Sequence, residues 1–203
     1  MKSLTMWAFC ALILIGNLAT AQKFAFSAQL AYASPKGEAF TDAITGERLS
    51  SFGLGADFDF LYHIEGVPDN LYMGITHNSN LLFGRQSENT SFDFGLYSLR
   101  LYGLKGVYRF LDGSVSPYGS LSLGLSRFIT PEVTSGGQVL LERKNAYSFG
   151  VRPEVGLDIH GFLLSVAYVV PMDYYVSSGL GAFSGTAGAL QFSAGYRVYF
   201  APF

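Results

Sequence analysis

The chain has 203 residues and a formal net charge of −2; 14% of its residues are charged and 16% are aromatic. Soluble proteins carry roughly 25% charged residues, so this composition indicates an outer surface that does not mainly face water. The length suits a single domain. No strongly basic segment is present, which excludes nucleic acid as an expected partner.

The N-terminus has the features of a secretory signal peptide. Lys2 supplies a positive charge, an apolar run covers residues 6–15, and Ala19 and Ala21 place small residues at the cleavage positions. This run is shorter than the ~20 residues of a membrane-spanning helix. We therefore predict a signal peptide at 1–21 and a mature domain at 22–203. Cys10 is the only cysteine, so the mature chain has no thiolate for a disulfide or a metal site, and we expect no cofactor.

Beyond residue 21 the sequence alternates between apolar residues and small or polar residues with a period of two, which is the pattern of β-strands. Between Phe52 and Tyr62, for example, Phe58 and Phe60 take one face and Asp57 takes the other. Eight segments show this pattern: residues 23–33, 52–62, 71–83, 96–110, 118–128, 147–159, 162–170 and 190–200. The chain is therefore predicted to be all-β with eight strands.

Two of these segments depart from strict alternation. In residues 96–110 the apolar positions change parity near Gly103, between Leu99 and Leu104, which predicts a β-bulge there. Pro153 lies inside the sixth segment. Because proline has no N–H to donate to a ladder, we expect that strand to be irregular.

The connections between the segments alternate in length. Long ones follow the first, third, fifth and seventh segments, at residues 34–50, 84–93, 129–146 and 172–187, and short ones lie at 65–70, 112–117 and 160–161. Long extracellular loops, short periplasmic turns and two periplasmic termini are the plan of an outer-membrane barrel. We predict an eight-stranded antiparallel transmembrane β-barrel with up-and-down topology.

The polar face of the segments indicates which side of the barrel is enclosed. A soluble barrel also alternates, but its polar face meets water and is rich in Lys and Glu, whereas here that face is mostly Gly, Ser and Ala. Buried charges require partners, so we predict salt bridges that plug a narrow lumen. The charges assigned to this network are Asp57, Asp59, Lys105, Arg109, Arg152, Glu154, Asp158 and Arg197. The outward face would carry the aromatic and aliphatic residues, as in a membrane; a soluble β-sandwich core is the alternative.

The last strand resembles the terminal-strand signal of outer-membrane barrels, because Gly195 is followed by Val198 and the aromatic Phe200 at the expected spacing. Ala201–Phe203 extends past the usual end of that signal. Together with the leader and the loop pattern, the mature chain resembles the small outer-membrane β-barrel family, which includes OmpX-like barrels and OmpA-like transmembrane domains. This resemblance implies the outer membrane of a Gram-negative bacterium, contact with outer-membrane lipid, and the barrel assembly machinery as a partner during biogenesis.

The sequence offers one candidate for chemistry. His77 and Ser79 are two residues apart on a strand, where a histidine can activate a hydroxyl, and His77–Asn80 resembles a stretch of lipid A deacylases. The spacing of the three histidines matches no metal site. Three hypotheses follow: a non-enzymatic structural or surface-interaction barrel, which we favour, a deacylase-like enzyme, and a narrow channel. The sequence identifies no extracellular partner.

Overall fold

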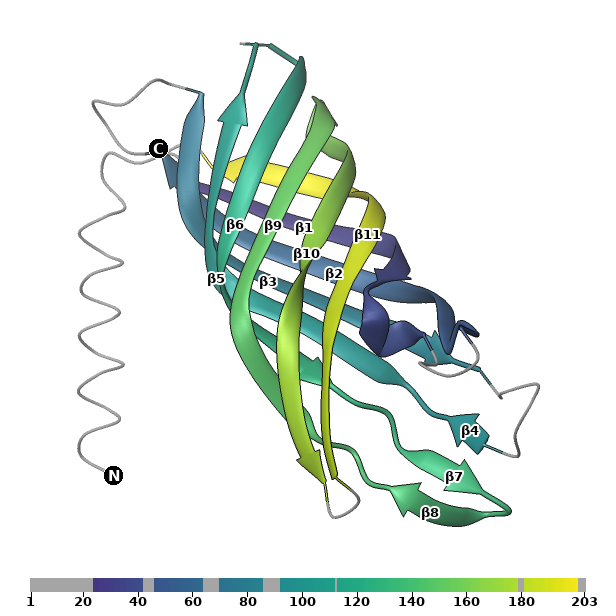
Figure 1. Cartoon of the computed structure of the whole chain (residues 1–203). Coiled ribbons are helices and arrows are strands. Elements are labelled where there is room, and N and C mark those ends of the chain that lie inside the picture. The colour runs from purple at the N-terminus through teal and green to yellow at the C-terminus, as the bar shows by residue number, and fades with distance from the viewer. Residues whose placement is uncertain are drawn as a thin grey trace, which may run out of the picture.

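The computed structural model describes residues 24–41, 46–63, 70–85, 92–111, 113–178 and 181–200. Within them, eight strands form a closed antiparallel barrel (Figure 1). These strands are β1 (Phe24–Lys36), β2 (Ser50–His63), β3 (Leu71–Gly84), β5 (Tyr97–Arg109), β6 (Val115–Ile129), β9 (Asn145–Ile159), β10 (Phe162–Ser178) and β11 (Gly181–Phe200). None of the helices in this part of the chain is long and apolar enough to cross a membrane.

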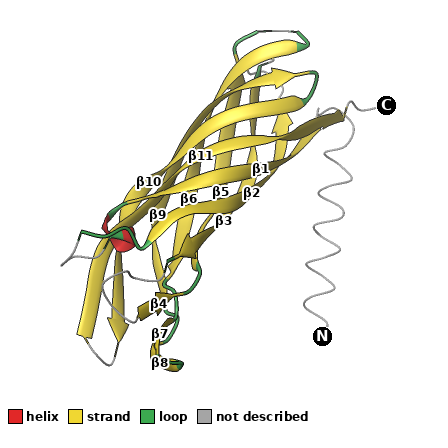
Figure 2. Ribbon diagram, turned by 90° about the vertical axis from the view of Figure 1, so that its right-hand side faces the viewer, coloured by secondary structure: helices red, strands yellow, loops and turns green. Residues whose placement is uncertain are grey.

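Each barrel strand pairs with the next one along the chain, and β1 closes the circle against β11, from Phe24–Phe200 to Lys36–Gly188. The strands run obliquely around the barrel, as Figure 2 shows. The predicted eight-stranded up-and-down barrel is therefore confirmed. The short connection predicted at residues 160–161 is also present, as a tight turn: His160 and Gly161 both have positive φ, 53° and 88°, as a type I′ hairpin turn requires.

The predicted bulge at Gly103 is wrong. β5 pairs without a register shift with β3 and with β6, and Leu99 and Leu101 are buried inside the barrel on the same face as Lys105. The parity of the apolar residues changes because the extracellular part of the lumen is itself apolar. The backbone is regular there.

Pro153 disturbs β9 on one side only. The ladder of β9 with β6 is regular through the Leu121–Pro153 pair, whereas the ladder with β10 runs from Ile159–Phe162 only to Glu154–Ala167. The missing N–H of proline thus falls where this second ladder ends.

Three of the predicted long loops contain β-structure. Residues 172–187 are not a loop, because β10 and β11 continue as a hairpin to Ser178 and Gly181 after a register shift between Val169 and Met172. Short strands from the other two connections, after β3 and after β6, form a second sheet in the order β4-β7-β8, which lies beyond the barrel in Figure 1. Its strands are β4 (Phe92–Phe94), β7 (Val133–Ser135) and β8 (Gln138–Leu141).

In the first long connection, residues 34–41 and 46–50 are described, and they fold onto the barrel. The connection contains the 3₁₀ helix η1 (Glu38–Phe40), and Phe40 is 2% exposed. Leu49 donates its backbone N–H to the carbonyl of Phe40 at 2.9 Å. This connection therefore contributes side chains to the interior of the barrel at its extracellular end.

Candidate functional site

The centre of the lumen holds a cluster of charges around Lys105 of β5. Its Nζ lies 2.7 Å from a carboxylate oxygen of Asp59, 2.9 Å from one of Glu154 and 3.8 Å from one of Asp57. The side chains of Lys105 and Glu154 are both 0% exposed. A fully buried ammonium is tolerated because three carboxylates from two strands surround it.

Arg152 of β9 completes this central cluster. Its Nη2 lies 2.6 Å from Asp57, its Nη1 donates to Glu154 at 2.9 Å, and its Nε donates to the side-chain oxygen of Gln191 at 2.7 Å. The cluster thus contains three carboxylates, Asp57, Asp59 and Glu154, and two cations, which gives it a formal charge of −1. Neutral polar groups supply the remaining contacts.

Hydroxyl side chains from the surrounding strands donate to Glu154 and Asp59, and amide side chains extend the network. Tyr118 donates its hydroxyl to Glu154 at 2.7 Å, and Ser27 and Thr76 donate to Asp59 at 2.8 and 2.7 Å. Gln191 donates to Asn80 at 2.6 Å, which extends the network to the far wall. These bonds lower the cost of burying Glu154 and Asp59, because they replace hydrogen bonds that water would otherwise provide.

A second, smaller cluster lies at the periplasmic end. Asp158 accepts a hydrogen bond from the hydroxyl of Tyr199, and its carboxylate lies 3.7 Å from Arg197 and 4.0 Å from Arg109. The Arg197 guanidinium is 5.2 Å from the ring centroid of Tyr118. One face of Tyr118 therefore contacts this cluster while its hydroxyl contacts the central one.

Tyr118 has room in the lumen because position 156 has no side chain. A Cβ on Gly156 would lie 2.7 Å from the ring atoms of Tyr118. The alternating glycines of the polar face thus set the space available to the large interior groups.

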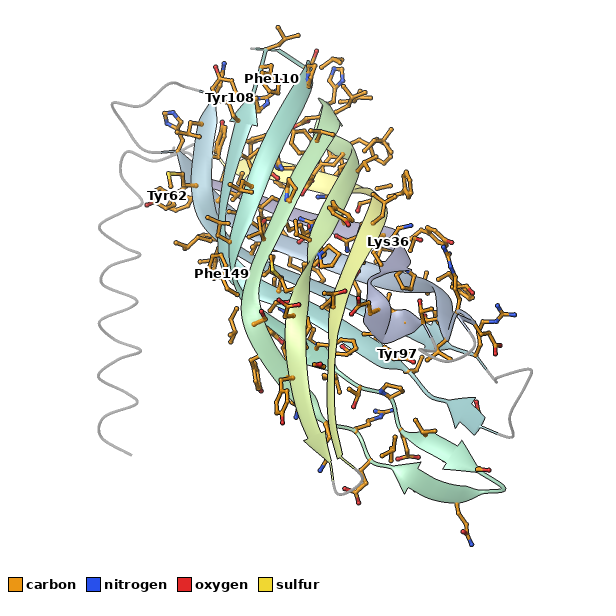
Figure 3. The ribbon with its side chains drawn as sticks, viewed as in Figure 1. Lys36, Tyr62, Tyr97, Tyr108, Phe110 and Phe149 are labelled. Carbon is orange, nitrogen blue, oxygen red and sulfur yellow. The ribbon has the colours of Figure 1, made fainter. Side chains whose placement is uncertain are left out.

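Apolar layers lie on both sides of the central charges. The extracellular layer is built around Phe40 of η1, whose ring packs against Tyr97 at 5.3 Å and Phe128 at 5.8 Å; Figure 3 shows Tyr97 beside η1. Tyr174 packs against Phe128 and shares a hydrogen bond with Ser126. The periplasmic layer comprises Ala25, Leu61, Tyr72, Val107, Tyr118 and Leu163. The charged level is therefore separated from both ends of the barrel.

The structure places all eight charged residues of the predicted network in the lumen, but it divides them into two clusters. The central one has an excess of one acid, and the periplasmic one, Asp158 with Arg109 and Arg197, has an excess of one base. Sequence reasoning missed Tyr118 and the amides Gln191 and Asn80. The two amides occupy polar positions of their strands, so alternation could have assigned them to the lumen. Tyr118 could not be assigned in this way, because a tyrosine is equally typical of the outward face.

His77 and Ser79 lie on the outer face of β3. The buried residues Thr76, Asn78 and Asn80 alternate with them on the lumen side, and the ring of His77 packs on Tyr102 at 4.5 Å. In the described part of the chain, no hydrogen bond or ion pair joins His77 to a carboxylate. A hydrolase role for the pair remains a hypothesis. The described residues also contain no group of His, Cys, Asp and Glu able to hold a metal ion.

The proposed assembly signal occupies two faces of β11. Val198 and Phe200 are exposed on the outer wall, and Gly195 faces inward where a Cβ would lie 2.5 Å from the Cα of Gln29. Gly195 is thus required for the close approach of β1 and β11. Recognition of this strand by the assembly machinery stays a prediction, as does the signal peptide at 1–21, which lies outside the described residues.

Exposed apolar side chains lie on the outer wall of all eight barrel strands. Leu30, Leu104 and Val155 are 74%, 67% and 65% exposed, and water would penalise such a surface strongly. In Figure 3, Tyr62, Tyr108 and Phe110 lie near one end of the barrel and Phe149 points away from its wall. An apolar belt with aromatic residues toward its edge is the surface that a barrel presents to lipid.

No protein-family model and no curated protein matches the chain, but solved structures do. The barrel resembles Ail, the attachment invasion locus protein of Yersinia pestis (TM-score 0.51, 16% identity, 88% of this chain and 100% of that chain). It also resembles Neisserial surface protein A (0.54, 20%, 87% and 97%) and the outer-membrane protein OprG of Pseudomonas aeruginosa (0.55, 14%, 88% and 97%).

These likenesses, at 20% identity or less, show the fold. The chain has the fold of the small eight-stranded outer-membrane barrels. With its apolar outer wall, it is a multi-pass β-barrel of the outer membrane.

Proposed function

We propose that this protein is a non-conducting, non-enzymatic barrel that anchors a β-structured surface outside the outer membrane for contact with a partner. One observation carries the proposal: the side chains of Lys105, Arg152 and Glu154, from two strands, meet in the lumen with 0% exposure. An eight-stranded barrel is just wide enough to be filled by side chains, so water and ions have no free path at this level.

The outer surface supports the second half of the proposal. The β4-β7-β8 sheet and the β10–β11 hairpin extend beyond the barrel wall on the side of the long connections. An ordered sheet offers a partner a surface with little ordering cost. A similar fold in an attachment protein of Yersinia pestis is consistent with a role at the cell surface.

Conductance tests the closed lumen. The refolded full chain in planar bilayers should give no current steps above a protein-free control, while a general porin in the same bilayers shows that the assay works. Reproducible current steps from the wild-type chain would contradict the proposal and favour the narrow-channel hypothesis.

Cysteine labelling tests the exposed surface. The predicted mature chain contains no cysteine, so Gln138→Cys in β8 and Ser114→Cys in the turn before β6 each introduce a single exposed thiol. A membrane-impermeant maleimide should label Gln138→Cys in intact cells and Ser114→Cys only after lysis. Labelling of Ser114→Cys alone in intact cells would reverse the orientation and overturn the proposed outer surface.

A further inference from the structure

Two arginines lie directly opposite each other on the outer wall. Arg100 of β5 pairs with Arg127 of β6 across the ladder. Their neighbours Leu99 and Phe128 are each 1% exposed in the lumen, so strand alternation points both guanidinium groups outward. Like charges directly opposite destabilise a strand pair, which makes this arrangement unfavourable unless an anion joins the two groups.

The protein supplies neutral partners to these arginines. Arg127 donates from Nε and Nη2 to the side-chain oxygen of Asn145 at 3.2 and 2.8 Å, and its guanidinium is 5.9 Å from the ring centroid of Tyr147. Arg100 donates from Nε to Ser98 at 3.2 Å. Within the part of the chain that the structure describes, neither arginine forms an ion pair with a carboxylate. N–H groups on both guanidiniums thus remain available to an anion.

The pair lies at the extracellular edge of the apolar belt. From Phe110, directly after the periplasmic end of β5, to Arg100 is eleven residues, and from Pro117 to Arg127 on β6 is also eleven. A tilted transmembrane strand needs ~9–11 residues to cross the hydrocarbon layer. Counted from the periplasmic side, both guanidiniums therefore reach the level of the outer-leaflet headgroups.

We propose that Arg100 and Arg127 bind the phosphate of a lipid in the outer leaflet. Each guanidinium is planar and presents several N–H donors, so two of them can bind the several acceptor oxygens of a tetrahedral phosphate group. The two arginines belong to a row of paired residues that crosses four strands. Ser79 of β3 pairs with Arg100 and Tyr147 of β9 pairs with Arg127, so a residue with a hydroxyl lies on each side of the arginine pair. The acyl chains of this lipid would lie on the apolar wall below, at Leu125 and Phe149.

The location identifies the ligand as a lipid. A soluble phosphate would gain nothing from the apolar wall, whereas a phospholipid or phosphorylated glycolipid contacts the wall and the arginines together. The proposal rests on the barrel lying in the outer membrane and is independent of whether the lumen conducts.

Binding of lipid A, a phosphorylated glycolipid, to the refolded full chain in detergent micelles tests the site. Wild type should bind lipid A and show a higher midpoint of its heat-modifiable gel transition, and Arg100→Gln with Arg127→Gln should weaken binding roughly tenfold. The matched control is Arg143→Gln with Lys144→Gln, which removes two exposed charges outside the barrel wall and should bind like wild type. Without lipid, the Arg100→Gln, Arg127→Gln variant should be at least as stable as wild type, because the repulsion is gone.

Three results would overturn the proposal. One is equal binding of lipid A by wild type and the double variant. Another is an equal shift of the midpoint with inorganic phosphate alone, which would make the site one for a soluble anion. The third is an equal shift with a diacylglycerol, which has the acyl chains but no phosphate and would make the effect a general one of lipid. If the double variant does not refold, Arg100→Gln alone decides, since it leaves the contacts of Arg127 with Asn145 and Tyr147 intact.

Discussion

The central charged level of the lumen and the apolar level above it fill the same barrel by different physical means. Around Lys105, each charge depends on partners at 2.6–2.9 Å from other strands, so loss of one partner leaves another charge buried and unpaired. Around Phe40, the contacts are ring packings at 5.3 and 5.8 Å, and loss of a ring removes only its own contacts. The charged level should therefore be the more sensitive to substitution.

Lys105→Met should give the largest effect. The substitution keeps most of the side-chain volume but leaves Asp57, Asp59 and Glu154 with Arg152 as their one cation, and breaking a buried ion pair costs about 3–5 kcal/mol. Urea unfolding in detergent, followed by the heat-modifiable band, measures the loss. Lys144→Met, at an exposed lysine, should stay within about 0.5 kcal/mol of wild type. Equal stability of the two variants would contradict the role given to the central cluster.

Phe40→Ala tests the apolar level. Truncation of a buried phenylalanine lowers the free energy of unfolding by about 3 kcal/mol at the lower end of the usual range. We expect this lower value here, because η1 can move into the space that the ring leaves. The control Tyr175→Ala removes an aromatic ring that is 66% exposed and should change the free energy of unfolding little. Conductance of Phe40→Ala should stay at the protein-free level, because the charged level remains closed. Current through this variant would assign the closure of the lumen to Phe40.

Tyr118→Phe affects the contact between the two charged clusters. The variant keeps the ring beside Arg197 and loses the hydroxyl that donates to Glu154. A hydrogen bond to a buried charge contributes about 2 kcal/mol, measured by the same urea transition. Tyr175→Phe, at an exposed tyrosine, is the matched control. If Tyr118→Phe is as stable as its control, the hydroxyl does not contribute to the burial of Glu154.

Alternation along the sequence predicted the barrel and the charged residues of its lumen, because a period of two assigns each residue to one face of a strand. Lys105 and Arg152 could be assigned in this way. The assumption that one face is uniformly polar failed at Leu99 and Leu101, which are apolar and interior, since the lumen changes from charged to apolar along its axis.

Contacts between distant segments could not be predicted by alternation. The β4-β7-β8 sheet pairs residues of the connection after β3 with residues of the connection after β6, which are far apart in the sequence. The division of the charges into two clusters depends on the register of β9 against its neighbours. That register places Glu154 and Asp158 at different levels of the lumen, with Tyr118 between the two clusters. Such pairings are set by the closed geometry of the barrel, which no single segment encodes.

Gly137→Ala should have the smallest effect on stability. It tests whether the outer sheet β4-β7-β8 unfolds independently of the barrel. Gly136 and Gly137 join β7 to β8 with φ of 58° and 81°. A Cβ at Gly137 meets no atom within 4 Å, so the cost of about 1 kcal/mol comes only from the left-handed backbone. If the hairpin opens locally, its limited proteolysis should become roughly fivefold faster, while the urea transition of the barrel is unchanged.

Gly106→Ala, in open space without a positive φ, should leave both measurements unchanged. A lowered urea midpoint for Gly137→Ala would mean that the outer sheet and the barrel unfold as one unit, and the surface proposed for partners would then be part of the barrel's own stability.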